Sequence, residues 1–257
     1  MVETNAERFF SMAETYDRMC TVLVPQYDFL QDEVLAIIKA SHCKPVTVVD
    51  LGAGSGIFID KILRKLPESR CYWVDYSHDF LRVAQNRLCG YGDRVEFVSC
   101  NLEQDWESAV KTRPDIIVSM SAIHHLENDA KQLLYNRCFE FLAEEGWFFN
   151  VDEMKTAYHD SYLGSLHRWA EHVDSWGTHV SAENRPYYDR WVKHFDNWKA
   201  RNIDRVDEPK QRGDDIHQSF IAQLEMLKTA GFSGVDVFLK YHLWCAIGGR
   251  RPKTLRA

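Results

Sequence analysis

"VVDLGAGSG" at residues 48–56 runs an apolar, strand-like stretch directly into a turn that contains three glycines. Glycine lacks a Cβ and tolerates positive φ, so such a turn lets another group come close to the backbone. A helical pattern, "IFIDKILRKL", follows at residues 57–66. The first N–H groups of a helix favour a negatively charged group on a ligand. The stretch therefore predicts a ligand site where a strand gives way to a helix.

Short apolar stretches alternate with helical patterns from residue 46 onward. The predicted strands are "TVVDLG" (47–52), "RCYWVDYS" (70–77), "RVEFVSCNL" (94–102), "DIIVSM" (115–120) and "WFFNVDEM" (147–154). Strands that alternate with helices pair in parallel through right-handed crossovers. "GVDVFLKYHLWCAIGG" (234–249) predicts two final strands, a pair at the sheet edge. The sequence therefore predicts an α/β fold.

The segments on either side of this core read as helices. We predict one domain, residues 1–257, with N-terminal helices at 1–45, a core at 46–154, a helical insert at 155–218 and a last helix with final strands at 219–257. Aromatic residues of the insert share one helical face: Tyr188, Trp191, Phe195 and Trp198. We interpret that face as packing between helices, and also as a wall that could close a substrate pocket.

Composition narrows the classes of partner. The net charge of −7 argues against a nucleic-acid surface, although basic residues within 185–205 keep RNA open. Seven cysteines, an odd number without a C-x-x-C pair, argue against a disulfide framework and favour reduced thiols in the cytoplasm. No apolar run approaches the roughly 20 residues of a membrane span. The sequence predicts no membrane partner, and a homodimer is compatible with it.

The glycine turn departs from a dinucleotide fingerprint, because its third glycine comes one residue early. Asp75 ends the second strand about twenty residues later, where a carboxylate can accept hydrogen bonds from ribose hydroxyls. Its alternative role is to cap the next helix. Tyr76 could cover one face of an adenine, and Asn101 with the Leu102 amide could contact the adenine edge.

Several motifs together resemble the ordered motifs of class I S-adenosylmethionine-dependent methyltransferases: "VVDLGAGSG", "VDYS", the Asn-Leu pair, "DIIVSMSAIHHL" and "LAEEGWFFNVDE". The resemblance covers roughly residues 46–154 and "LKTAGFSGVDVF" (227–238). It implies a Rossmann-like, seven-stranded, mostly parallel sheet whose last strand is antiparallel, with S-adenosyl-L-methionine as cofactor. The cofactor-binding residues that it implies are Asp50, Gly52, Ala53, Gly54, Asp75, Tyr76, Asn101, Leu102 and Ser119. The family commonly has Asp in place of Asn101.

A narrower resemblance concerns residues 19–30. "MCTVLVPQYDFL" is similar to the segment that precedes the glycine turn in carboxy-S-adenosylmethionine synthases. It implies that Tyr27 reaches over the amino-acid end of the cofactor, with Tyr16 as a second candidate. An alternative activity follows, that of a carboxy-S-adenosylmethionine synthase-like or tRNA-modifying enzyme, in which Arg201 would pair with the added carboxylate. A non-catalytic S-adenosylmethionine-binding module is a further alternative.

The expected reaction is methyl transfer to a small-molecule acceptor. The candidate proton acceptors are His124, His125, Asp152 and Glu153, which follow the fourth and fifth strands. We expect the two adjacent histidines to point apart, so that they chelate poorly and no metal is bound. The alternatives are that one histidine caps while the other packs, and that the two acids form a solvated strand end.

Overall fold

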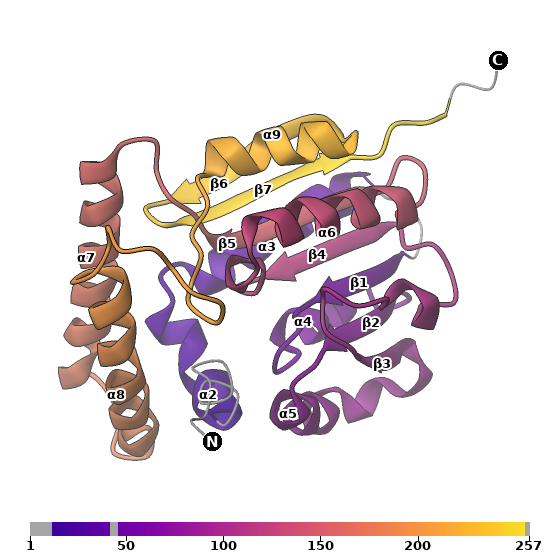
Figure 1. Ribbon diagram of the computed structural model, residues 1–257. Helices are drawn as coiled ribbons and strands as arrows, with labels where there is room; N and C mark the ends of the chain where they lie inside the picture. The colour runs from indigo at the N-terminus through magenta and orange to yellow at the C-terminus, as the bar shows by residue number, and fades with distance from the viewer. Residues whose placement is uncertain (1–11, 42–45, 255–257) are drawn as a thin grey trace.

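The computed structural model describes residues 12–41 and 46–254, which form a seven-stranded sheet with helices on both faces (Figure 1). The first five strands lie within the stretches that the sequence predicts, and the last two extend one residue beyond either end of the predicted stretch 234–249. The strands are β1 (Thr47–Leu51), β2 (Arg70–Asp75), β3 (Val95–Ser99), β4 (Ile116–Met120), β5 (Trp147–Glu153), β6 (Ser233–Tyr241) and β7 (Trp244–Arg250).

The strand order is β3-β2-β1-β4-β5-β7-β6. The pairs from β3 to β5 are all parallel, and β7 runs antiparallel to both β5 and β6. The predicted class I topology, with an antiparallel last strand, is thus confirmed. Of the last two strands only β6 lies at an edge of the sheet, because β7 inserts between β6 and β5. Burial of residues 244–249 shows that β7 is an inner strand.

Two apolar cores lie on opposite faces of the sheet, because successive strand residues point to opposite sides. Val48 belongs to one core and Val49 to the other. The core that includes Val49 contains side chains from α6 (Asn128–Phe141) and α9 (Phe220–Ala230). These two helices lie side by side over the sheet in Figure 1. The αL conformation of Gly231 ends α9, as its position in the sequence predicts.

The opposite core contains residues of α2 (Ala13–Leu23), α3 (Tyr27–Ser41), α4 (Ile57–Lys65), α5 (His78–Leu88), α7 (His159–Ser175) and α8 (Arg185–Asn202). Figure 1 shows α7 and α8 as a pair beside the sheet, close to α2. Trp169 Nε1 of α7 donates to the Leu23 carbonyl at 2.9 Å. The four aromatic residues of the predicted face are all buried in this core, as the packing interpretation expects.

Short 3-10 turns complete the chain: η1 (Cys89–Arg94), η2 (Glu107–Ala109), η3 (Ile123–His125) and η4 (Trp176–Thr178). Among the residues described, none of the helices combines the length and the apolar character that crossing a lipid bilayer requires.

Candidate active site

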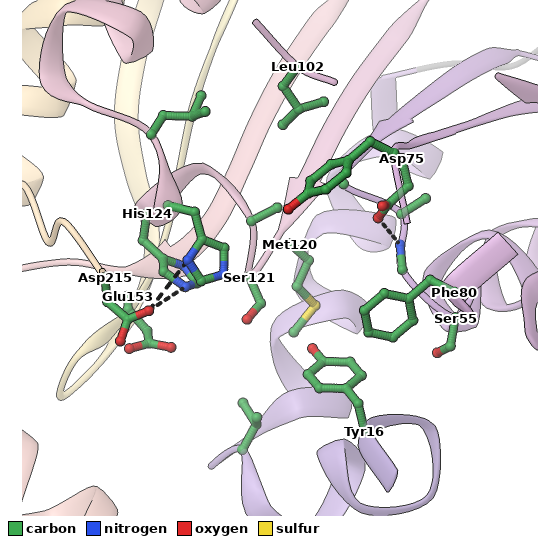
Figure 2. Close-up of a pocket in the computed structure, with 18 of the residues that line it drawn as sticks. Tyr16, Ser55, Asp75, Phe80, Leu102, Met120, Ser121, His124, Glu153 and Asp215 are labelled. Carbon is green, nitrogen blue, oxygen red and sulfur yellow. Dashed lines mark hydrogen bonds and ion pairs between the residues drawn. The ribbon is translucent and has the colours of Figure 1, made fainter. Parts of the chain in front are cut away.

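A cavity of about 390 Å³ lies between the sheet, the N-terminal helices and α8. Figure 2 shows Asp75 and Phe80 on one side of it, His124, Glu153 and Asp215 on the other, and Met120 and Ser121 between them. Most of the predicted site residues line it: Tyr16, Tyr27, Asp50, Gly52, Ala53, Gly54, Asp75, Tyr76, Asn101, Leu102, His124, His125 and Glu153.

The glycine turn is held tightly against two neighbouring segments. The N–H groups of Gly52 and Ala53 donate to the Val74 carbonyl at 2.8 and 3.2 Å. Gly52 has φ of 70°, and a Cβ added to it would lie 2.3 Å from the Ala122 Cβ. Gly54 has φ of 51° and has room for a Cβ. The turn therefore needs glycine at position 52 for a contact within the protein, while Gly54 leaves the backbone open toward the cavity.

Asp75 connects the glycine turn to the end of β2. Its carboxylate accepts hydrogen bonds from Gly54 N at 3.0 Å and from Ser77 N at 2.9 Å. Burial raises the Asp75 pKa to about 6, although these N–H donors lower it. The helix cap is Ser77, whose hydroxyl accepts from Phe80 N. The alternative that Asp75 merely caps the helix is therefore wrong.

Asp50 is a buried acid at the end of β1 that lines the cavity. Burial, together with the nearby Asp75 carboxylate, raises its pKa to about 8. Within the described residues its carboxylate has no hydrogen-bond donor. Burial of a carboxyl group without a hydrogen-bond partner costs free energy. A hydrogen-bond donor or a cation of a ligand would therefore be favoured beside Asp50.

Two tyrosines from the N-terminal helices close one wall of the cavity. The Tyr16 hydroxyl lies near Ser121 and Tyr27, and the Tyr27 hydroxyl lies near the Cys20 thiol. Burial raises the pKa of both phenols, so both remain neutral. The Tyr16 ring also meets Phe80 edge to face, with centroids 5.6 Å apart. The wall therefore offers hydroxyl groups inside an otherwise aromatic surface.

The predicted adenine contacts lie after β2 and β3. Tyr76 is exposed, whereas Leu102 is buried. Asn101 Oδ1 accepts from Glu103 N at 2.9 Å, which fixes the side chain in a turn. A carbonyl oxygen has two lone pairs, so the Asn101 oxygen can still accept a second hydrogen bond.

Two predicted residues lie behind the lining rather than in it. Ser119 is fully buried, and its hydroxyl donates to the Leu51 carbonyl at 2.8 Å, which joins β4 to β1. The structure therefore does not place Ser119 where it could contact a ligand, and Met120 and Ser121 line the cavity instead. Asp152 is fully buried beneath His124.

His124 is anchored by Asp152 through two contacts. Its Nδ1 lies 2.6 Å from Asp152 Oδ1, and its backbone N–H donates to Oδ2 at 2.8 Å. Burial disfavours the charged ring, but Asp152 and then Glu153 raise the His124 pKa to about 9. Asp152 and Glu153 are both buried, so the alternative of a solvated strand end is wrong.

The two adjacent histidines do not point apart, and the expectation that they would is wrong. Their ring centroids lie 4.0 Å apart. His124 Nε2 is 3.6 Å and His125 Nδ1 is 3.4 Å from Asp215 Oδ1. The loop that carries Asp215 lies against η3, so one carboxylate draws both rings to the same side (Figure 2). Burial and the neighbouring His124 lower the His125 pKa.

"GDDIHQSF" (213–220) contributes site residues that the sequence reasoning missed. Ile216 N donates to the His124 carbonyl at 2.7 Å, which brings the loop to η3. His217 Nε2 lies 2.9 Å from Glu153 Oε2, and its Nδ1 lies 2.7 Å from the Tyr162 hydroxyl. The available signal was the density of titratable residues directly before the Ser219 helix cap.

Five aromatic side chains of the insert and β7 line the cavity: Trp169, Trp191, Phe195, Trp198 and Trp244. Arg201 also lines the cavity, on the side of Asp215: its guanidinium lies 3.6 Å from Asp214 and 3.7 Å from Asp215. His194 lies near Arg201 and Asp215, and burial lowers the His194 pKa to about 4. The cavity can therefore hold a flat or apolar molecule that carries a polar group.

Three comparisons bear on the family. Residues 49–148 match a family model described as a methyltransferase domain. A carboxy-S-adenosyl-L-methionine synthase 1 from Yersinia pseudotuberculosis is 26% identical over 59% of this chain and 66% of its own length. A trans-aconitate 2-methyltransferase from Acidovorax sp. is 32% identical over 44% of this chain and 40% of its own length. These matches thus span less than two thirds of either relative.

Among solved structures, human N-acetylserotonin methyltransferase in complex with S-adenosylmethionine superposes with a TM-score of 0.60. It is 13% identical, and the alignment covers 98% of this chain and 60% of the human chain. At that identity the likeness concerns the fold. The strand order, the glycine turn and these matches together show that the chain has the class I S-adenosylmethionine-dependent methyltransferase fold, and residues 49–148 are the part that matches the family model.

Proposed function

We propose that this protein is an S-adenosylmethionine-dependent methyltransferase that acts on a small-molecule acceptor. One observation carries the proposal: a single cavity is lined both by the cofactor motifs of the sheet and by the aromatic residues of the insert. Donor and acceptor can therefore meet in one enclosed space. The volume of about 390 Å³ is within the range of small-molecule sites.

The lining residues fit the chemistry of the cofactor. Asp75 offers carboxylate oxygens to ribose hydroxyls, and Asn101 with Leu102 lies where adenine would be held. Asp50 offers an acid to the amino-acid end of the cofactor, beside the Tyr27 hydroxyl, and its carboxylate lacks a protein donor within the described residues. Gly54 leaves space for that end to approach the backbone of the turn.

Methyl transfer is an in-line displacement, in which the acceptor atom bonds to the methyl carbon as the carbon–sulfur bond breaks. The sulfonium charge is lost with the methyl group. The protein mainly holds the two partners aligned and excludes water. The predicted proton acceptors His124, His125 and Glu153 line one end of the cavity, with Asp152 behind His124. We infer that the acceptor molecule binds at this end, between η3 and the insert.

A second candidate is the carboxy-S-adenosylmethionine synthase-like activity. Arg201 favours it, because its guanidinium lines the cavity and could pair with an added carboxylate. Asp214 and Asp215 already neutralise much of that charge, which favours methyl transfer instead. Mass spectrometry of the ligand carried by the purified protein separates the two, because a carboxylated cofactor is heavier than S-adenosylmethionine.

We place the enzyme in the cytoplasm, as a single domain that binds no membrane and that could form a homodimer, with nucleic acid as a less favoured but still open partner. The six cysteines within the described residues are free thiols, which supports a reducing compartment. Size-exclusion chromatography with light scattering tests the oligomeric state.

The central test is cofactor binding by the Asp75→Ala variant. Loss of the carboxylate strands ribose hydroxyls and the Gly54 N–H, so affinity for S-adenosylmethionine should fall by about 1–3 kcal/mol. Isothermal titration calorimetry measures this difference. Asp79→Ala, a change in the exposed first turn of α5, is the matched control and should bind as the parent does. Unchanged affinity in Asp75→Ala would show that Asp75 does not bind the ribose. Failure of the parent protein to bind S-adenosylmethionine would contradict the proposed function.

A further inference from the structure

Three nitrogen and oxygen atoms near Asp215 are spaced like the ligands of one metal ion. His124 Nε2 and His125 Nδ1 lie 3.6 and 3.4 Å from Asp215 Oδ1, and all three ligand atoms lie within 4.8 Å of one another. Around a four-coordinate ion with bonds of about 2.0–2.1 Å, neighbouring ligands are about 3.3–3.4 Å apart. We propose that His124, His125 and Asp215 bind a divalent first-row transition-metal ion.

Neighbouring groups already orient two of these ligands. Asp152 Oδ1 lies 2.6 Å from His124 Nδ1, which fixes the ring so that Nε2 faces Asp215. A metal ion would displace the proton from Nε2, while Nδ1 keeps its contact with Asp152. A carboxylate that supports a ligating histidine in this way is a common feature of metal sites. Asn202 Nδ2 donates to Asp215 Oδ2 at 2.8 Å, which leaves Oδ1 facing the two rings. Such orientation reduces the reorganisation that metal binding would require.

The charge around the three ligand atoms favours a cation. The carboxylates of Asp152, Glu153 and Asp215 are all buried at this end of the cavity. Among the described residues, the fixed positive charge in contact with Asp215 is Arg201, at 3.7 Å from Oδ2. Once a metal ion displaces the proton from His124, both imidazole rings are neutral and the local charge is negative. A divalent ion would balance it inside a region that is largely shielded from water.

The position of the cluster gives the ion a role. All three ligand residues line the cavity, so a set of three protein ligands leaves a coordination position open toward it, as catalytic rather than structural sites do. An oxygen or nitrogen atom of the acceptor could occupy that position. A bound cation lowers the pKa of such a group and holds it in place. This assignment of the open position rests on the proposed function, whereas metal binding itself does not.

The test is Zn²⁺ binding by the full chain after chelator treatment, followed by calorimetry and metal analysis. The expected result is one Zn²⁺ per chain. Asp215→Asn and His125→Gln should each bind at least tenfold more weakly, and Asp152→Asn should lose about 10–100-fold. Asp214→Asn is the matched control, because Asp214 is the neighbour of Asp215 but lies outside the three ligands. Replacement of Zn²⁺ by Co²⁺ should give the visible absorption of a tetrahedral nitrogen–oxygen site.

Absence of stoichiometric Zn²⁺ binding, or equal affinity in Asp215→Asn and Asp214→Asn, would overturn the proposal. Circular dichroism shows whether each variant folds. Should Asp215→Asn fail to fold, His125→Gln decides, because the half-exposed His125 side chain can change without opening the core. S-adenosylmethionine binding is measured on the same samples. Zn²⁺ binding without cofactor binding would contradict the proposed function and leave the metal site standing.

Discussion

The absence of a Cβ at Gly52 allows the glycine turn to pack against Ala122. A Cβ at position 52 would lie 2.3 Å from the Ala122 Cβ, whereas the nearest atom to a Cβ at position 54 is 3.9 Å away. Both residues have positive φ. The two positions therefore carry the same backbone strain with alanine but differ in steric cost.

We predict that Gly52→Ala destabilises the protein by at least about 2 kcal/mol more than Gly54→Ala. The Gly54→Ala variant should lose about 1 kcal/mol, the cost of a non-glycine residue in the left-handed region. Urea denaturation gives both free energies of unfolding. Equal losses in the two variants would show that the turn can move away from η3.

The ionisation of Asp50 makes stability depend on pH. Its pKa is raised from 3.8 to about 8 by burial and by Asp75. Between these values the folded protein holds a proton that the unfolded chain has lost, so the free energy of unfolding falls as the pH rises. This contribution is complete below pH 3.8 and is lost by about pH 8.

We predict that Asp50→Asn matches the parent near pH 4 and is more stable than it at pH 8, by on the order of 3 kcal/mol. Chemical denaturation at a series of pH values measures the difference. Asp79→Asn, an exposed change, should follow the parent at every pH. If the curve of Asp50→Asn ran parallel to that of the parent, Asp50 would not carry the raised pKa.

Among the site residues, those whose position depends only on nearby sequence could be predicted. The glycine turn and Asp75 follow from a strand, a turn and a strand end, which together span fewer than thirty residues. Asp215 and His217 lie in a loop without periodicity. They reach the site through a long-range contact, from Ile216 N to the His124 carbonyl. No local pattern encodes such a contact, so these residues could not be predicted.

At the level of secondary structure, α7 attaches the insert to the N-terminal helices. Trp169 Nε1 donates to the Leu23 carbonyl, and His172 Nε2 lies 2.9 Å from the Val22 carbonyl, both at the end of α2. The Trp169 ring also packs against Trp198, with centroids 4.5 Å apart. The insert is therefore docked on the N-terminal helices.

We predict that Trp169→Phe lowers the free energy of unfolding by about 1–3 kcal/mol, because it leaves the Leu23 carbonyl without its donor and removes part of a buried ring. Trp176→Phe is the control, since Trp176 is only partly buried, and should cost less than about 0.5 kcal/mol. Thermal denaturation compares the two. A loss in Trp176→Phe as large as that in Trp169→Phe would mean that the contact with α2 contributes nothing.

The strands themselves could be predicted, because five apolar stretches alternate with helical patterns. The place of β7 between β5 and β6 could not be obtained from periodicity, which gives elements but not their order. The resemblance to the methyltransferase family implied the antiparallel direction of the last strand, but not its position. The direction of the His124 and His125 rings also escaped prediction, because it depends on a carboxylate ninety residues further along the chain.

At the scale of the whole molecule, the cavity joins three parts of the chain. Tyr16 comes from α2, Asp75 from the sheet and Trp191 from α8, and all three line it. A ligand that fills this cavity would contact all three parts. Any ligand that binds only the folded state stabilises all of these parts together.

We predict that S-adenosylhomocysteine at 100 times its dissociation constant raises the free energy of unfolding by about 2.7 kcal/mol, in one cooperative transition. Denaturation followed by both tryptophan fluorescence and circular dichroism tests this. Two separate transitions, of which only one responded to the ligand, would show that the insert unfolds independently of the sheet.

The two ends of the insert lie next to each other. Lys155 and Ser219 form a parallel bridge, in which Phe220 N donates to the Lys155 carbonyl at 3.2 Å. The chain thus leaves and rejoins the sheet domain at one place, and long excursions between fixed ends add little entropic cost. Residues 155–218 could therefore be exchanged for another segment during evolution without a change in the sheet. Such an exchange would alter the acceptor specificity and leave the residues that bind the methyl donor unchanged.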